Sequence, residues 1–347
     1  MTQEILTRRD GVAAIISLNR PKAIHALTRG MCEDMMAALT GWASDDTVGV
    51  VMIDHAEGRG FCSGGDINLL RKSALEDGGI SGRRFFYDEY RLNHQLFTYA
   101  KPVVAFMDGI TMGGGVGISQ PAAWRVATEN TRYAMPESGI GLFPDVGGGW
   151  YLSRLDGHVG TFLALTGARL DGAECLWAGL STHYLAADML DEAKRRIAAG
   201  EEIGKVLAEL SAEAPEPKIA AHAADIARHF AFDTLEEVIA SLEADEGEWA
   251  QKQLAILRSK SPQACKVALR QLSQSLELDS FAKNMAMEYR IGARVLVLPD
   301  FAEGVRAVIV DKDNAPQWNP ARPEQVTPDM LDAIFAPLPD NEEWKPS

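Results

Sequence analysis

The chain has 347 residues, and its 34 lysines and arginines against 49 aspartates and glutamates give a formal net charge of −15 at pH 7. A chain this acidic is a poor candidate for a non-specific nucleic-acid binder, which needs a basic surface against phosphates. The four cysteines form no CxxC pair and are too few for a disulfide scaffold. They indicate a reducing compartment, and we expect the cytoplasm.

The start of the chain, residues 1–9, resembles neither a signal peptide nor a transit segment. No apolar run approaches the roughly 20 residues of a membrane span, so we expect no membrane partner.

Strand and helix signals alternate in the first half of the chain. Alternating apolar residues predict half-buried strands, short apolar runs predict buried strands, and a 3.6-residue period predicts helices. The predicted elements, in chain order, are a hairpin at Asp10-Gly11, a helix capped by Thr28 that runs to about Ser44, a strand over Val48–Ile53, a helix over Arg83–Ala100, and strands over Pro102–Met107, Trp124–Thr128 and Tyr133–Met135.

Helical patterns dominate from about Gly147 onward. A proline-rich stretch, Ala214–Pro217, predicts a linker, and Pro262–Leu276 and Phe281–Leu298 predict long helices. Prolines between Asn314 and Pro328 exclude a continuous helix there. We therefore expect an α/β core over residues 1–205 and a helical C-terminal region over residues 206–347.

Motifs of several common enzyme classes are missing from the sequence. No G-x-x-x-x-G-K-[ST] occurs, which argues against a P-loop nucleotide hydrolase. No G-x-S-x-G elbow occurs, which argues against the common type of serine hydrolase. The histidines are scattered without H-E-x-x-H, so we expect no metal.

Two glycine-rich loops each follow a buried strand, at Phe61–Asp66 and at Met112–Gly117. Glycine lets a ligand approach the backbone closely, and two such loops can aim two N–H donors at one oxygen, as in an oxyanion hole. The alternative is a pair of tight turns. Cys62, in the first loop, is expected to be a small buried residue rather than a nucleophile.

Carboxylates in apolar surroundings are the candidate catalytic groups. Glu137 and Asp145 lie in one strongly apolar, glycine-rich segment, where desolvation would disfavour their charged forms. Asp145 could instead cap the helix that follows it. Glu89 lies beside the aromatic face of the Arg83–Ala100 helix, and its alternative is a solvated helix edge.

Together these segments resemble the crotonase (enoyl-CoA hydratase/isomerase) superfamily. The resemblance covers nearly the whole chain, and its later motifs are those of thioester hydrolases within the superfamily. The segments that carry it are Asn19-Arg20-Pro21, Cys62–Asp66, Gly109–Gly117, Met135–Glu137, Gly141–Gly148, Asp300–Ala307, Asp311–Asp313 and Trp318.

The resemblance implies a spiral of ββα repeats with a helical C-terminal region, and an acyl-CoA thioester as substrate. Its thioester oxygen would lie between the N–H groups of Gly65 and Gly114. CoA is then part of the substrate, and no separate cofactor is expected. Hydratases of this superfamily use two glutamates, and the first would stand at the position of Gly117. Asp145 stands where hydratases have glycine.

This exchange of acids favours hydrolysis of a 3-hydroxyacyl-CoA, such as 3-hydroxyisobutyryl-CoA in valine catabolism or 3-hydroxypropionyl-CoA. One alternative is a hydratase or isomerase of the same superfamily, and another is a CoA-binding protein without activity. The chain could form a homo-oligomer, as related crotonases often do, or fold its C-terminal part back on its own core.

The resemblance also implies roles for individual residues. Glu137 would activate water or attack the thioester itself, and Asp145 would orient the water or the substrate's 3-hydroxyl group. Glu89 would assist on the acyl side. The basic residues near the glycine loops, and thus candidates for the CoA phosphates, are Arg20, Lys22 and Arg59.

Overall fold

The computed structural model describes residues 3–346, so Met1 and Thr2, at the start of the expected N-terminal strand, lie outside it. Its strands form a six-stranded sheet in the order β1-β2-β3-β5-β7-β10 and a four-stranded sheet in the order β4-β6-β8-β9. The strands are β1 (Ile5–Asp10), β2 (Ala13–Leu18), β3 (Val50–His55), β4 (Gly60–Cys62), β5 (Val103–Met107), β6 (Ile110–Met112), β7 (Trp124–Ala127), β8 (Arg132–Ala134), β9 (Leu170–Asp171) and β10 (His183–Tyr184).

Successive strand pairs build the spiral. β3 and β4 enter different sheets, and the pairs β5–β6 and β7–β8 repeat this step, each parallel to the pair before it. Only the ends depart from this pattern, since β1 forms the expected antiparallel hairpin with β2 and β9 is antiparallel to β8. The predicted spiral of ββα repeats is confirmed.

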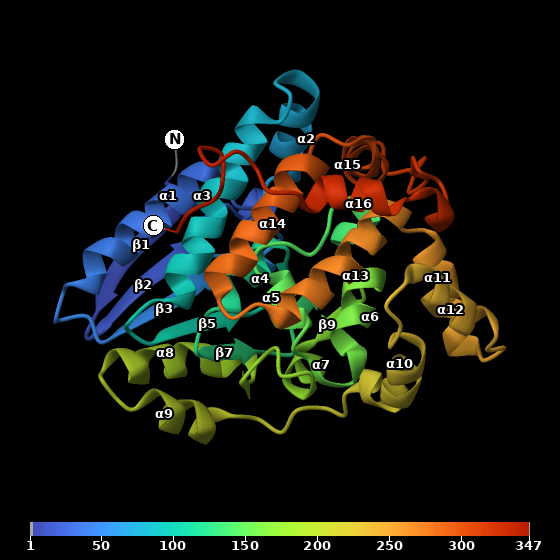
Figure 1. Ribbon diagram of the computed structural model, residues 1–347. Helices are drawn as coiled ribbons and strands as arrows, with labels where there is room; N and C mark the ends of the chain where they lie inside the picture. Colours follow the sequence, from blue (N-terminus) through green and yellow to red (C-terminus); the bar gives the residue numbers. More distant parts are fainter. Residues whose placement is uncertain (1–2, 347) are drawn as a thin grey trace.

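Helices cover both faces of the larger sheet (Figure 1). α1 and α3 pack on one face, and α8 and α9 close the other with buried side chains such as Leu190, Ile197 and Val206. The helices are α1 (Arg29–Ala43), α2 (Ile67–Glu76), α3 (Ile80–Phe97), α4 (Gly114–Ser119), α5 (Gly148–Leu152), α6 (Val159–Thr166), α7 (Gly172–Trp177), α8 (Leu190–Ala198), α9 (Ile203–Leu210), α10 (Ala223–His229), α11 (Leu235–Glu243), α12 (Glu248–Arg258), α13 (Pro262–Glu277), α14 (Phe281–Val295), α15 (Pro299–Val305) and α16 (Pro328–Phe335).

The C-terminal helices return to the core. α14 packs along α3, and α13 packs on α5 and α6, as Figure 1 shows. One cluster of buried apolar side chains runs from Ile5 to Trp344 and includes both parts of the chain. The division at residue 205 stays a prediction. No helix within residues 3–346 is long and apolar enough to cross a membrane.

Local capping explains where two helices near the site begin. The Thr28 side chain accepts a hydrogen bond from the Met31 N–H, as expected for α1. The Asp66 side chain likewise accepts from the Leu69 N–H and starts α2, a helix that the sequence pattern did not reveal. α2 forms one wall of the cavity described below.

Candidate active site

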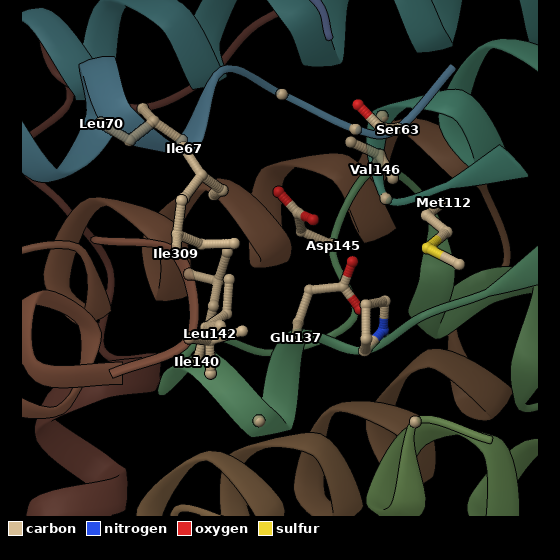
Figure 2. Close-up of a pocket in the computed structure, with 18 of the residues that line it drawn as sticks. Ser63, Ile67, Leu70, Met112, Glu137, Ile140, Leu142, Asp145, Val146 and Ile309 are labelled. Carbon is tan, nitrogen blue, oxygen red and sulfur yellow. The ribbon is translucent and has the colours of Figure 1, made fainter. Parts of the chain in front are cut away.

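A cavity of about 550 Å³ opens where the two glycine loops meet the loop that carries Glu137 and Asp145. Figure 2 shows both carboxylates pointing into the same space, with an apolar wall opposite. The residues of this wall are Ile67, Leu70, Ile140, Leu142 and Ile309.

The two glycine loops are locked together. A Cβ atom on Gly115 would overlap the carbonyl oxygen of Cys62, so only glycine permits this approach. Burial raises the pKa of the Cys62 thiol to about 12, as suits a packed side chain. Gly65 and Gly114 line the cavity, and neither N–H donates to a backbone acceptor in the turns and loops of residues 3–346. Two amide donors are thus available to a ligand.

Three carboxylates meet beside these glycines: Glu89 on α3, Glu137 in the turn after β8, and Asp145. Each is at most 4% exposed. The Glu137 Oε1 atom lies 3.1 Å from the place of a Cβ on Gly113, and the Glu89 Oε1 atom lies 2.5 Å from that of a Cβ on Gly114. The structure therefore brings the predicted acids to the predicted N–H donors.

Burial dominates the electrostatics of the three acids. It raises the pKa of Glu137 and of Glu89 well above the ordinary value, and the neighbouring charge of Asp145 raises both further. The pKa of Asp145 is raised to about 7 by burial, against the opposing effect of a hydrogen bond from Tyr90. Three acids this close cannot all be ionised at neutral pH.

Two of these acids carry oxygen atoms without a hydrogen-bond partner. The Glu89 Oε1 and Glu137 Oε2 atoms are buried and unbonded within residues 3–346. Buried polar atoms almost always have a partner in native proteins. Free oxygens that face a cavity are therefore suited to a substrate or a water.

Both alternatives weighed for these acids are wrong. Asp145 does not cap α5, since the residue at that position is Gly147, and the Asp145 Oδ2 atom instead accepts a hydrogen bond of 2.8 Å from the Tyr90 hydroxyl. Glu89 is not at a solvated edge, since it is only 2% exposed.

Neighbouring side chains occupy the space next to Gly117, where a hydratase would have its first glutamate. A Cβ atom on Gly117 would lie 2.6 Å from the Val146 Cβ and 2.8 Å from the Asn93 Nδ2. Both distances are shorter than real Cβ contacts, so a longer side chain has no room there. The packing therefore agrees with the sequence that the hydratase glutamate is replaced at position 117, while Asp145 supplies an acid nearby.

The acidic loop is held by a group that sequence reasoning missed. Glu288 on α14 is fully buried and accepts hydrogen bonds from the N–H groups of Gly147 (2.7 Å) and Gly149 (3.0 Å). The side chains of Gln271 and Asn284 each donate to it at 2.9 Å. Burial raises the pKa of Glu288 to about 8, although the hydrogen bonds from Gly147, Asn284 and Gly149 oppose the shift. We call Glu288, Gln271 and Asn284 the loop clamp.

The loop clamp forms hydrogen bonds with the backbone on both sides of Asp145, because Gln271 also donates to the carbonyl oxygen of Pro144 at 2.7 Å. Its members lie more than 120 residues from that loop in the sequence. The one available signal was a pair of polar residues, Asn284 and Glu288, four positions apart on an otherwise apolar helix face.

The basic residues expected to bind CoA lie elsewhere. Arg20 forms an ion pair of 2.6 Å with Asp66, and Lys22 and Arg59 are exposed. None of the three lines the cavity, whereas Arg169 and Lys260 do. A role for Arg20, Lys22 and Arg59 in CoA binding stays a prediction.

Metal ligands are not gathered in the part of the chain that the structure describes: no group of three or more His, Cys, Asp or Glu side chains could hold an ion. The expectation that the protein needs no separate cofactor stays a prediction.

Solved structures share the whole fold. A carnitinyl-CoA dehydratase from Mycobacterium thermoresistibile superposes with a TM-score of 0.93 and 38% identity, covering 98% of each chain. An enoyl-CoA hydratase from Rhodobacter sphaeroides has a TM-score of 0.92 and 36% identity, covering 99% of this chain and all of the other.

Curated relatives bear a different name. The proteins from Xenopus tropicalis and Homo sapiens are 40% and 38% identical, over 96% and 97% of this chain and 89% of each relative. Each is called "3-hydroxyisobutyryl-CoA hydrolase, mitochondrial".

The same names correct one expectation. A cytoplasmic location is contradicted, because these relatives are mitochondrial proteins. Unpaired cysteines indicate a reducing compartment, but they do not distinguish one such compartment from another.

The family comparison covers nearly the whole spiral and the C-terminal helices. The family described as enoyl-CoA hydratase/isomerase matches residues 13–335. That range contains both glycine loops, the three acids and the loop clamp. The chain therefore belongs to the enoyl-CoA hydratase/isomerase family, the crotonase superfamily.

Proposed function

We propose that this chain hydrolyses the thioester bond of 3-hydroxyisobutyryl-CoA and releases 3-hydroxyisobutyrate and CoA. The observation that carries the proposal is the exchange of acids: Asp145 is held in the cavity, while Val146 fills the space next to Gly117. The names of the curated relatives support the same reaction and the same acyl group. The pathway that goes with this substrate is valine catabolism.

The thioester oxygen accepts hydrogen bonds from the N–H groups of Gly65 and Gly114. These donors are fixed by the interlocked loops, so they stabilise the negative charge that develops on this oxygen without reorganising. Glu137 takes a proton from water, and the water oxygen attacks the thioester carbon. The CoA thiolate then leaves the tetrahedral intermediate.

A second route starts with Glu137 itself as the nucleophile and passes through an anhydride. Single turnover in ¹⁸O-labelled water separates direct attack from an anhydride that water opens at the Glu137 carbon. Direct attack by water puts one labelled oxygen into every product molecule. If water attacks the Glu137 carbon of an anhydride, the label stays in the protein and the first product is unlabelled.

The other two acids recognise the acyl group. Asp145 accepts a hydrogen bond from the 3-hydroxyl group of the substrate, while its Oδ2 atom accepts one from the Tyr90 hydroxyl. Burial beside two other acids raises the pKa of Glu89, which favours its protonated form. A protonated carboxyl group donates a hydrogen bond, which lets Glu89 bind an acceptor oxygen of the acyl group.

Thiol release from a panel of thioesters tests the function. We expect rapid release from 3-hydroxyisobutyryl-CoA, slower release from isobutyryl-CoA, and none from crotonyl-CoA. 3-Hydroxypropionyl-CoA differs by one methyl group, worth about 1–3 kcal/mol of discrimination. Loss of crotonyl absorbance without thiol release would identify a hydratase instead. The Glu137→Gln variant is the control for background hydrolysis.

A further inference from the structure

Two cations stand in the cavity wall without a carboxylate partner. Lys260, between α12 and α13, is half-buried, and Arg169, before β9, is exposed. Neither side chain forms a hydrogen bond or an ion pair with any residue from 3 to 346. Lys260 differs from the exposed unpaired cations of the surface because its ammonium group is partly removed from water, a cost that a bound anion would offset.

The Lys260 side chain lies over two glycines. Its Nζ atom is 3.2 Å from the place that a Cβ on Gly139 would take and 3.6 Å from that of a Cβ on Gly167. Gly139 belongs to the same turn as Glu137. The ammonium group is thus close to the catalytic turn, and the glycines leave room for it.

The backbone around Lys260 is fixed. The Ser261 N–H donates to the Ser138 carbonyl oxygen at 3.1 Å, and the Ser259 carbonyl accepts from the Trp318 indole at 3.0 Å. The Ser261 hydroxyl also donates to Asp300. Lys260 is therefore anchored on both sides.

The two cations are also close enough to affect each other. Burial lowers the pKa of the Lys260 ammonium group, and the positive charge of Arg169 lowers it further. Like charges held together without a counter-ion are unfavourable, and an anion between them would remove that cost.

We propose that Lys260 and Arg169 bind a phosphate of the CoA portion of the substrate. This inference rests on the proposed function, because it assumes that the acyl group occupies the cavity beside Glu137. The two cations share the cavity wall with the acids, whereas Arg20, Lys22 and Arg59 lie outside it. The 3′-phosphate and the pyrophosphate of CoA offer the same chemistry to this pair.

Steady-state kinetics with three thioesters of one acyl group test the site: the CoA, 3′-dephospho-CoA and pantetheine forms. For Lys260→Gln we expect the KM of the CoA thioester to rise about tenfold or more, with little change in kcat, because a charge-assisted contact is lost. The KM of the pantetheine thioester should not change. If wild type and variant also have equal KM for the dephospho form, the 3′-phosphate is the bound group; otherwise it is the pyrophosphate.

Two further variants are controls. Lys260→Arg keeps the charge and should keep most of the affinity. Lys252→Gln removes an exposed lysine on α12 that does not line the cavity, and should leave every KM unchanged. Far-UV circular dichroism and a melting curve establish that each variant is folded.

Binding of free CoA, measured by calorimetry, separates this inference from the proposed function. A dissociation constant that rises about tenfold in Lys260→Gln supports the site even if no thioester is hydrolysed. If thioesters are hydrolysed but Lys260→Gln and Arg169→Gln bind CoA like wild type, the site is wrong. An equal rise in KM for the pantetheine thioester would also overturn it, because the lysine would then act through packing.

Discussion

Glu137 is the residue on which the chemistry depends most directly. Its carboxylate faces the cavity with one oxygen unbonded, beside the turn that carries Gly113. We expect Glu137→Gln to lower kcat about 100- to 10,000-fold, the usual contribution of a general base, with a much smaller change in KM. Thiol release under steady-state conditions measures this. Near-normal turnover would remove Glu137 from the mechanism.

Asp145 should control which acyl groups are accepted. In Asp145→Asn we expect the ratio of kcat/KM for 3-hydroxyisobutyryl-CoA over isobutyryl-CoA to fall about tenfold or more, because a charged acceptor for the hydroxyl group is lost. The absolute rate on isobutyryl-CoA serves as the internal control. If both substrates lose activity equally, Asp145 acts on the water and not on the hydroxyl group.

The pH dependence of the reaction follows from burial. The base must be ionised, and its pKa is raised, so kcat/KM should increase with pH through the neutral range. The Tyr90 hydrogen bond lowers the pKa of Asp145, so Tyr90→Phe raises that pKa. The charge of Asp145 also raises the pKa of Glu137, so the clean measurement is the ratio of kcat/KM for 3-hydroxyisobutyryl-CoA over isobutyryl-CoA, in which the ionisation of Glu137 cancels. Tyr90→Phe should move the rise of this ratio with pH to higher pH, and an unmoved ratio would mean that Asp145 does not titrate in the reaction.

At the scale of single elements, the sequence predicted the turns and helix caps that depend on neighbouring residues. The hairpin at Asp10-Gly11 and the cap at Thr28 are confirmed because each depends on a few adjacent residues. α2 was missed because no element was predicted between the loop that ends at Asp66 and the helix at Arg83, although Asp66 is itself the cap of a helix. The three acids and the glycines were identified in advance, because the family resemblance adds to what each motif indicates alone.

The loop clamp could not be predicted in the same way. It joins α13 and α14 to a loop far earlier in the chain, and no periodicity links such distant positions. Its effect on the reaction is indirect: Glu288 fixes the backbone of Gly147 and Gly149, and this backbone directs Asp145. The clamp is thus a positioning device.

Glu288→Gln tests this positioning role. The amide nitrogen would face groups that are themselves hydrogen-bond donors, so at least one hydrogen bond of the clamp would be lost. The loop around Asp145 should then be held less firmly, and we expect kcat to fall about tenfold or more. A double-mutant cycle with Asp145→Asn is the sharper measurement. If Glu288 acts through Asp145, its loss should add little to the effect of Asp145→Asn, whereas fully additive losses would indicate a separate structural role.

At the scale of the whole molecule, the chain behaves as one packed unit. The buried cluster includes Ile5 near one end and Trp344 near the other, and α14 packs along α3. The predicted division into residues 1–205 and residues 206–347 marks a change of composition. The cytoplasmic location was wrongly predicted because the cysteine content indicates a reducing environment and does not identify the compartment.

A fragment of residues 1–205 should therefore not fold alone. It would expose the face of α3 that α14 covers and leave the loop around Asp145 without its clamp. We expect no cooperative thermal transition in circular dichroism, whereas the full chain should show one. A cooperative transition of the fragment would make the first 205 residues an independent domain.

The contact between Gly117 and Val146 also constrains how the chemistry of this fold can be redesigned or can diverge. A glutamate at position 117 has no space beside Val146 and Asn93, so this substitution would be harmful until changes at those positions have opened the pocket. Positions 117 and 146 are thus epistatic, and the order of changes matters. A library that varies single positions would miss every route between hydrolase and hydratase that passes through this pair.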